Sequence, residues 1–227
     1  MRIDIEHFKN TLYKEAAELF PKIIEQYKHE GIYSIALYNS GTSWSYLFPT
    51  FATHKGLEKT ISAYQKKEWY KDETVEELTK DLKWSPCDSP YHGLLEFYLK
   101  ETTELVDDIF EAIQEMYDQE CDAYEGPGEA KTPLTNALQQ QLETTCLDTL
   151  IKLDADGVFA GLERDSFILN LLNGDQSYEE RLERAEKVNP PSAFASYQQD
   201  LQVLIEEAQQ AGEETFAMLE KLSQTEH

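Results

Sequence analysis

Seven carboxylates recur along one stretch of the chain at the spacing of a single helical face. Their separations alternate between three and four residues, which places all seven on one side of an α-helix. They are Glu101, Glu104, Asp108, Glu111, Glu115, Asp118 and Asp122. The opposite side of the same segment carries apolar residues that include Leu99, Val106 and Ile113. The pattern predicts a helix with one side in the core and one uniformly negative side in solvent.

A row of carboxylates can bind a basic protein, can bind a hard cation, or can simply be solvated. Between Glu96 and Glu129 the chain has 12 acidic residues and only Lys100 as a base, whereas a solvated helix face usually mixes both signs. The like-charge pairs cost about 1–3 kcal/mol in total, which burial of the apolar side outweighs, so the fold tolerates the row even without a function. Mg²⁺ or Ca²⁺ usually needs further ligands from elsewhere in the fold. We therefore favour the docking of a protein rich in lysine and arginine.

Cys87, Asp88 and His92 lie close together in the sequence and have the residue types of a thiol nucleophile, an orienting group and a base. Nothing in their spacing shows that the histidine faces the thiol. We interpret them as buried or capping groups and predict no catalytic residue. The histidines show no metal-ligand spacing, and the sequence predicts neither a metal site nor a cofactor.

Aromatic residues crowd the first half of the chain, and most of them should belong to the core. Some could instead line a groove for a peptide or a small ligand. The candidate groove residues are Trp44, Trp84, Asp88 and His92. This groove is the basis of an alternative hypothesis, in which the chain is a small-molecule-binding or enzymatic domain.

Helices must position these side chains. The apolar period predicts a helix over residues 4–30, kinked or split at Pro21. The acidic row belongs to a helix that is expected to begin at Ser89-Pro90 and to end near Cys121. Further helices are predicted at residues 54–68, 74–81, 133–153, 177–188 and beyond 191, two of them opened by capping boxes.

Two β regions interrupt the helices. Residues 32–38 and the alternating residues 44–48 predict a hairpin with a central first strand, and residues 166–171 predict a later strand. The order of elements predicts an α+β fold, with a mainly antiparallel sheet built from the two β regions and packed with several helices. Because each β region is too small to stand alone, we expect a single domain over residues 1–227, in which the loop near 122–133 could separate two lobes.

The charge balance limits the classes of partner. The chain carries 44 acidic and 20 basic residues, for a net charge of −24. Nucleic acids and anionic membranes bind through basic surfaces, so we predict no nucleic-acid partner and no membrane partner. The three cysteines form no C-x-x-C pair, which is typical of a reducing compartment. Without an apolar signal core or a membrane span, the predicted location is the cytoplasm.

Three sequence blocks occur in a characteristic order, at residues 31–53, 82–88 and 157–190. In this order they resemble the bacterial domain-of-unknown-function family 4303, and the resemblance covers about residues 10–200. The resemblance implies a compact bacterial α+β domain. It implies no activity, cofactor or catalytic residue.

These observations lead to one main hypothesis. We expect a non-enzymatic acidic protein-interaction domain, an immunity or accessory protein by analogy with other small acidic bacterial domains, that binds a basic protein partner. The groove described above is the alternative. A third alternative is a structural subunit of an oligomer that associates through an apolar patch on the last helix.

Overall fold

The computed structural model describes residues 3–126 and 131–225, with side chains as far as residue 213 and at Thr215. Residues 127–130 of the predicted loop therefore lie outside the described part. The helices and strands are α1 (Ile5–Tyr27), β1 (Ile32–Asn39), β2 (Leu47–Thr53), α2 (His54–Tyr64), α3 (Val75–Leu82), α4 (Lys100–Asp122), α5 (Pro133–Ala155), β3 (Ile168–Asn173), α6 (Tyr178–Val188) and α7 (Pro191–Thr225). This arrangement is the predicted α+β fold.

The strands form one mixed sheet in the order β2-β1-β3. Strand β1 is central, as predicted, and pairs antiparallel with β2. Strand β3 lies on the other side of β1 and runs parallel to it, with Asn39 opposite Asn173 where the two strands end. The expectation of a mainly antiparallel sheet is therefore wrong for the second β region. A parallel pair needs a long connection, and helices α2 to α5 supply it.

The second strand of the hairpin begins later than residues 44–48 predict. Trp44 is not in a strand: it adopts a left-handed conformation with φ 51°, and its side chain is buried in the core. Burial of the indole offsets the roughly 1–2 kcal/mol that this conformation costs. Pro49 lies in β2, where the missing N–H is tolerated because β2 is an edge strand.

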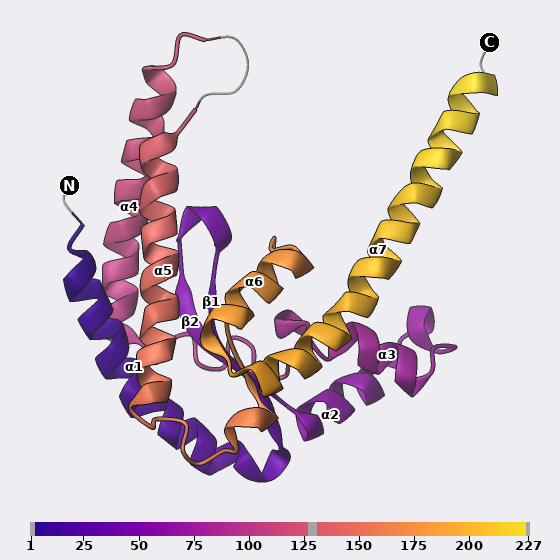
Figure 1. Ribbon diagram of the computed structural model, residues 1–227, viewed down its shortest axis with the longest axis horizontal. Coiled ribbons are helices and arrows are strands. Elements are labelled where there is room, and N and C mark those ends of the chain that lie inside the picture. Colours follow the sequence, from indigo (N-terminus) through magenta and orange to yellow (C-terminus); the bar gives the residue numbers. More distant parts are fainter. Residues whose placement is uncertain (1–2, 127–130, 226–227) are drawn as a thin grey trace.

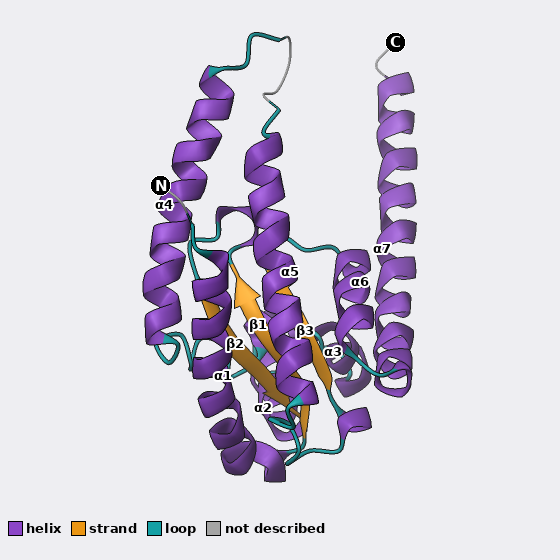
Figure 2. Cartoon of the chain, turned by 60° about the vertical axis from the view of Figure 1, so that its left-hand side comes forward, coloured by secondary structure: helices purple, strands orange, loops and turns teal. Residues whose placement is uncertain are grey.

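The side chains of β1 alternate between two layers. Ile35 and Leu37 join the main core, which is formed with α1, α4 and α5. Ala36 and Tyr38 lie on the opposite face, which is covered by residues 83–92 and by the beginning of α7. Figures 1 and 2 show α1, α4 and α5 together on one side of the strands.

Helix α1 continues through Pro21, so the predicted split does not occur. Phe20, Ile23 and Ile24 are buried on either side of the proline. At about 1.5–3 kcal/mol for each buried side chain, their packing outweighs the roughly 3 kcal/mol cost of an internal proline.

Helix α4 begins at Lys100 and not at Ser89-Pro90. The Ser89 hydroxyl donates to the carbonyl oxygen of Phe51 in β2 (2.8 Å), and residues 89–98 form turns instead of helix. The first turn of α4 is capped from another helix, because Glu15 of α1 accepts the backbone N–H of Glu101 (3.0 Å) and of Thr102 (2.8 Å).

Side-chain amides occupy the outer edge of β3. Asn189 donates to the carbonyl oxygen of Leu169 (2.7 Å) and accepts its N–H (2.8 Å). At Leu171, the N–H donates to Asn170 Oδ1 (2.8 Å) and the carbonyl oxygen accepts from Gln176 (3.3 Å). These three side chains take the place of a neighbouring strand.

The predicted capping boxes are present at Thr74 and Ser177, where they open α3 and α6. Helix α7 begins at Pro191 after the predicted break, and Figure 1 shows it running away from the rest of the molecule. Most side chains beyond residue 213 lie outside the described part, and so does much of the predicted apolar patch on this helix. Among the described residues, no helix is long and apolar enough to cross a membrane.

Candidate functional site

All seven carboxylates of the predicted row are exposed on one side of α4. We call this surface the acidic face; it consists of Glu101, Glu104, Asp108, Glu111, Glu115, Asp118 and Asp122. On the other side of the helix Val106, Ile109 and Ile113 are buried in the main core. Figure 2 shows α4 at the outer edge of the molecule. The helix therefore separates a core side from a charged side, as its sequence period requires.

Little positive charge compensates the acidic face. Lys14 Nζ lies 3.7 Å from Glu101 Oε1, and both side chains are 63% exposed, so solvent screens this pair. Glu104, Asp108, Glu111 and Asp118 form no ion pair within the part of the chain that the structure describes. The face thus presents a row of charges of one sign.

Both ends of α4 are held by carboxylates outside the acidic face. Glu15 caps the first turn, and Glu120 in the last turn joins α4 to α5. Glu120 accepts the backbone N–H of Leu134 (2.7 Å) and both the N–H (3.0 Å) and the hydroxyl (2.7 Å) of Thr135. Burial raises the pKa of Glu120, but the three hydrogen bonds together hold that pKa below its ordinary value. The acidic face is therefore carried by a helix that is anchored at both ends.

Trp44 does not join the other three residues of the predicted groove. Trp44 is 2% exposed and belongs to the core between the sheet and helices α1, α4 and α5. Trp84 and His92 contact the opposite face of the sheet, and Asp88 lies between them in sequence. Trp44 lies apart from the others because the chain adopts a left-handed conformation at this residue, shortly after β1. This conformation buries the indole in the main core.

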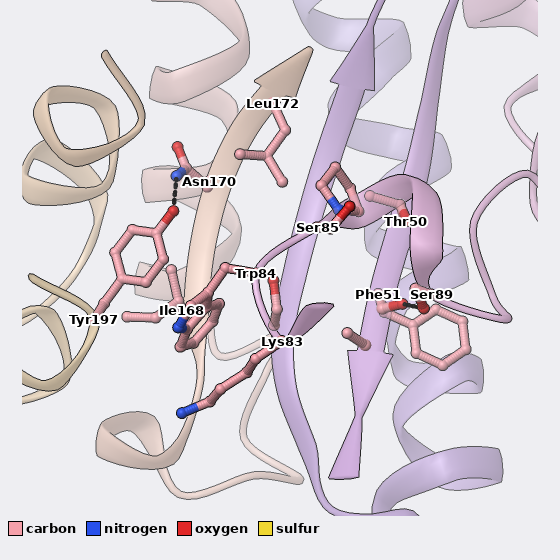
Figure 3. A pocket seen from close by; sticks show the side chains of 13 residues that line it. Thr50, Phe51, Lys83, Trp84, Ser85, Ser89, Ile168, Asn170, Leu172 and Tyr197 are labelled. Atoms are coloured by element: carbon pink, nitrogen blue, oxygen red, sulfur yellow. Dashed lines mark hydrogen bonds between the residues drawn. The ribbon is translucent and has the colours of Figure 1, made fainter. Parts of the chain in front are cut away.

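Trp84 fills space instead of lining a groove. Its ring packs edge-on against Tyr33 and Tyr197, with centroids 5.2 and 4.6 Å apart, and its Nε1 donates to Asp200 Oδ2 (2.9 Å). Figure 3 shows Trp84 lying against the sheet beside Ile168. The cavity that remains here measures about 20 Å³, which is room for about one water molecule. It is too small for a substrate.

A wider, open groove of about 770 Å³ lies between α3 and α7. Ion pairs cross it, from Lys83 to Asp200 (2.6 Å) and from Lys80 to Glu207 (2.8 Å). Trp84 lies at its border, but Asp88 and His92 are not among the residues that line it. It is therefore not the groove that the sequence predicts.

Asp88 and His92 make contacts that stabilise the fold. Asp88 accepts hydrogen bonds from the hydroxyls of Tyr64 and Ser85. The ring of His92 packs edge-on against Tyr38, with centroids 4.6 Å apart. Burial lowers the pKa of His92 below its ordinary value of 6.5. These contacts agree with the interpretation of both residues as structural groups.

Cys87 is exposed, so the interpretation as a buried group is wrong for this residue, and its thiol is not joined to a base. Its Sγ lies 3.4 Å from the hydroxyl of Tyr38, and no hydrogen bond links it to Asp88 or His92 among the described residues. Nor does that part of the chain contain a group of three or more histidine, cysteine, aspartate or glutamate side chains arranged to hold a metal ion.

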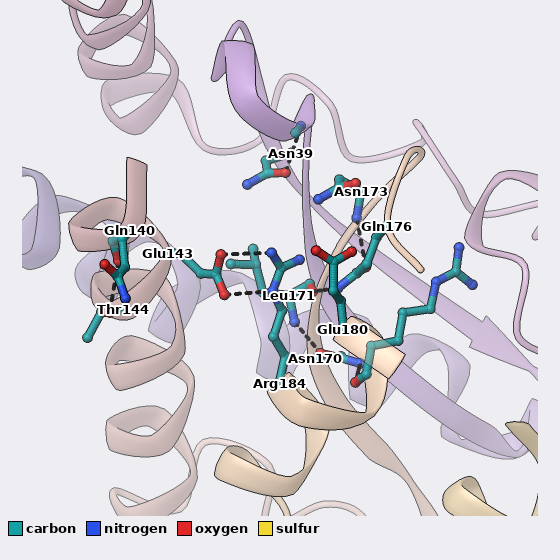
Figure 4. A network of polar contacts seen from close by, with 12 residues as sticks. Asn39, Gln140, Glu143, Thr144, Asn170, Leu171, Asn173, Gln176, Glu180 and Arg184 are labelled. Atoms are coloured by element: carbon teal, nitrogen blue, oxygen red, sulfur yellow. Dashed lines mark hydrogen bonds and ion pairs between the residues drawn. The ribbon is translucent and has the colours of Figure 1, made fainter. Parts of the chain in front are cut away.

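A polar pocket that sequence reasoning missed lies where β1 and β3 end. It has a volume of about 370 Å³ and lies between the strand ends and helices α5 and α6. Figure 4 shows Asn39 and Asn173 side by side, near the pair formed by Glu143 of α5 and Arg184 of α6. In the sequence, each asparagine closes an apolar strand and a glycine follows within two residues. This pattern indicates a pocket only when the two strands are known to be parallel neighbours, because their ends then lie at the same edge of the sheet.

Comparison with known proteins adds a family assignment. No curated protein and no solved structure matches the chain. A family model described as Domain of unknown function (DUF4303) matches residues 12–190. The match runs from α1 to the end of α6 and includes all strands of the sheet, while α7 lies beyond it. The chain therefore belongs to the DUF4303 family.

Proposed function

We propose that this chain is a non-enzymatic protein-interaction domain of the bacterial cytoplasm, whose acidic face binds a basic protein. The observation that carries the proposal is the exposure of all seven carboxylates on one side of a single anchored helix. A row of one sign attracts an oppositely charged partner over a distance and selects against acidic proteins.

The acidic face also suggests the shape of the partner. At 1.5 Å per residue, the distance along α4 from Glu101 to Asp122 is about 30 Å. A helix with lysines and arginines at intervals of three and four residues presents a matching row. Within this proposal the partner is a basic toxin or effector that the domain masks, as an immunity or accessory protein does.

The alternative of a ligand-binding or enzymatic groove has less support. Trp44 lies apart from the other predicted groove residues, and the cavity beside Trp84 is about 20 Å³. The pocket at the ends of β1 and β3 is lined by Trp44 but by none of Trp84, Asp88 and His92.

Charge reversal tests the proposal. The variant with Glu104→Lys, Asp108→Lys, Glu111→Lys and Glu115→Lys removes the negative row and should keep the fold, because all four side chains are exposed. The tagged protein is used to capture proteins from lysate of its host at about 50 and about 150 mM NaCl, and bound proteins are identified by mass spectrometry. We expect the native chain to retain a basic protein, more strongly at low salt, and the variant to lose it.

A matched control has the same change in net charge at another place. Glu18, Glu163, Glu183 and Glu186 are exposed and lie outside α4, and their replacement by lysine should leave capture of the basic protein intact. Equal capture by the two four-lysine variants would contradict the proposal. So would loss of capture in the control alone.

A further inference from the structure

The polar pocket at the ends of β1 and β3 has the position of a ligand site. In sheets with parallel strands, ligands bind at the carboxyl ends of the strands, and here these ends open into a pocket of about 370 Å³. A pocket of this volume accommodates a small metabolite. Its walls come from three parts of the fold, namely the strand ends, α5 and α6, as Figure 4 shows.

Two asparagines form the floor of the pocket. Asn39 and Asn173 are 3% and 8% exposed and lie opposite each other in the register of β1 and β3. Each uses its Oδ1 to accept a backbone N–H two residues later, from Gly41 (2.9 Å) and Asp175 (3.0 Å) respectively. These bonds fix both side chains in the same orientation.

Within the described part of the chain, the amide nitrogens of these two asparagines have no hydrogen-bond partner. No hydrogen bond from Asn39 Nδ2 or Asn173 Nδ2 exists within the described residues. Polar atoms that are fully shielded from solvent and lack a partner do occur in this fold, but these two nitrogens are not among them. Both are therefore partly accessible, and the two asparagines line the pocket. The floor therefore presents two hydrogen-bond donor groups whose positions are already set.

A guanidinium forms one wall. Arg184 binds Glu143 through two parallel hydrogen bonds, from Nε (2.7 Å) and Nη2 (2.7 Å), and this pair joins α6 to α5. Its third nitrogen, Nη1, is shielded from solvent and has no hydrogen-bond partner among the described residues. A shielded donor without a partner costs free energy, and because Nη1 is shielded, Arg184 contributes its positive charge to the pocket and not this donor.

The exposed rim has the opposite character. Asp175 and Glu180 are exposed carboxylates that line the pocket. Together with Glu143 they outnumber the one cation, Arg184, so the pocket has a net negative charge and disfavours phosphate and other anions. Donors on the floor and carboxylates on the nearby rim match a small molecule that carries an acceptor group beside a cationic group, because Asn173 and Asp175 both border the space next to Gly41.

We propose that this pocket binds a free α-amino acid. Its carboxylate accepts hydrogen bonds from Asn39 Nδ2 and Asn173 Nδ2, and its ammonium group faces Asp175 and Glu180 at the rim. A zwitterion of this kind satisfies the donors and the neighbouring carboxylates together without adding net charge. This binding is independent of the acidic face, which lies on α4.

The test uses the twenty L-amino acids as probes, with sodium phosphate and glucose beside them. Binding to the full chain is measured by isothermal titration calorimetry and by the shift in the melting temperature. We expect saturable binding of at least one amino acid and none of phosphate or glucose. The absence of binding by every amino acid would overturn the proposal, and so would preferential binding of phosphate or glucose.

Two variants locate the binding. Asn39→Asp and Asn173→Asp keep the oxygen that closes each turn but replace the donor with an acceptor, so the fold should survive while affinity falls about tenfold or more. Asn10→Asp makes the same chemical change at an exposed position on α1 and should bind like the native chain. Asp175→Asn, which leaves the floor intact, should also weaken binding. Unchanged affinity in Asn39→Asp and Asn173→Asp would place the amino acid elsewhere and overturn the proposal.

Discussion

His92 is a half-buried histidine whose ring is enclosed by Tyr38 and Phe48. Burial lowers its pKa below the ordinary value of 6.5, and the pKa of His54 is lowered by burial and by Lys83. Between the folded and unfolded pKa values, these two histidines are therefore neutral in the folded chain and protonated in the unfolded chain. By linkage, protonation of these two histidines lowers the free energy of unfolding as the pH falls from about 6.5 toward their folded pKa values.

Replacing His92 with phenylalanine tests this relation. The variant His92→Phe keeps an aromatic ring against Tyr38 but cannot be protonated, so the loss of stability between about pH 7.5 and about pH 5 should be smaller than in the native chain. Urea unfolding at several pH values measures the difference. His29, which is exposed in the turn after α1, provides the control His29→Phe, and an equal pH dependence in both variants would contradict the assignment to His92.

At the scale of elements, α4 depends on caps that other helices provide. Glu15 supplies the acceptors that the local sequence lacks at the first turn, because Leu99 at the N-cap position makes no side-chain cap. Unpaired N–H groups at a helix start are costly when water cannot replace the partner. The position of the acidic face thus relies on a contact between α1 and α4.

Removing this cap should destabilise the fold. Glu15→Ala leaves the N–H groups of Glu101 and Thr102 without their acceptor and should lower the free energy of unfolding by about 1 kcal/mol. Urea unfolding followed by circular dichroism measures the loss. Glu18→Ala, an exposed change on the same helix, should have little effect, and equal losses in the two variants would show that the cap is not the cause.

A feature could be predicted from the sequence when the residues that form it lie close together in the chain, and could not when they lie far apart. The acidic face, the capping boxes at Thr74 and Ser177 and the central position of β1 follow from residues close together in the chain, and the structure has them. Three other features depend on residues far apart in the chain. They are the cap from Glu15, the hydrogen bond from Ser89 to β2 and the parallel direction of β3. The polar pocket was missed for the same reason, since its floor exists only where β1 and β3 meet.

At the scale of the whole molecule, the net charge of −24 opposes the compact state. Like charges repel more strongly in the folded chain than in the expanded unfolded chain, and salt screens this repulsion. The acidic face on α4 concentrates part of that charge on one helix. Stability should therefore depend on ionic strength, with a contribution from this face.

We expect the melting temperature to rise when NaCl is increased from about 20 to about 200 mM. The rise should be smaller for the four-lysine variant of the acidic face, because that variant has less charge to screen. Thermal unfolding followed by circular dichroism at constant pH measures both. A melting temperature that fell with salt, or that rose more in the variant, would contradict this view of the folded chain.

The edge of the sheet at β3 restricts how a partner can bind. Proteins that recruit an extended peptide as an additional strand do so through the unpaired N–H and C=O groups of an edge strand. Here Asn189, Asn170 and Gln176 already occupy those groups at Leu169 and Leu171, and β2 on the other edge contains Pro49. Both edges are thus poor templates for strand addition and for the edge-to-edge contacts that begin aggregation. A binding partner must recognise helix surfaces and loops, and its contacts will be made by side chains.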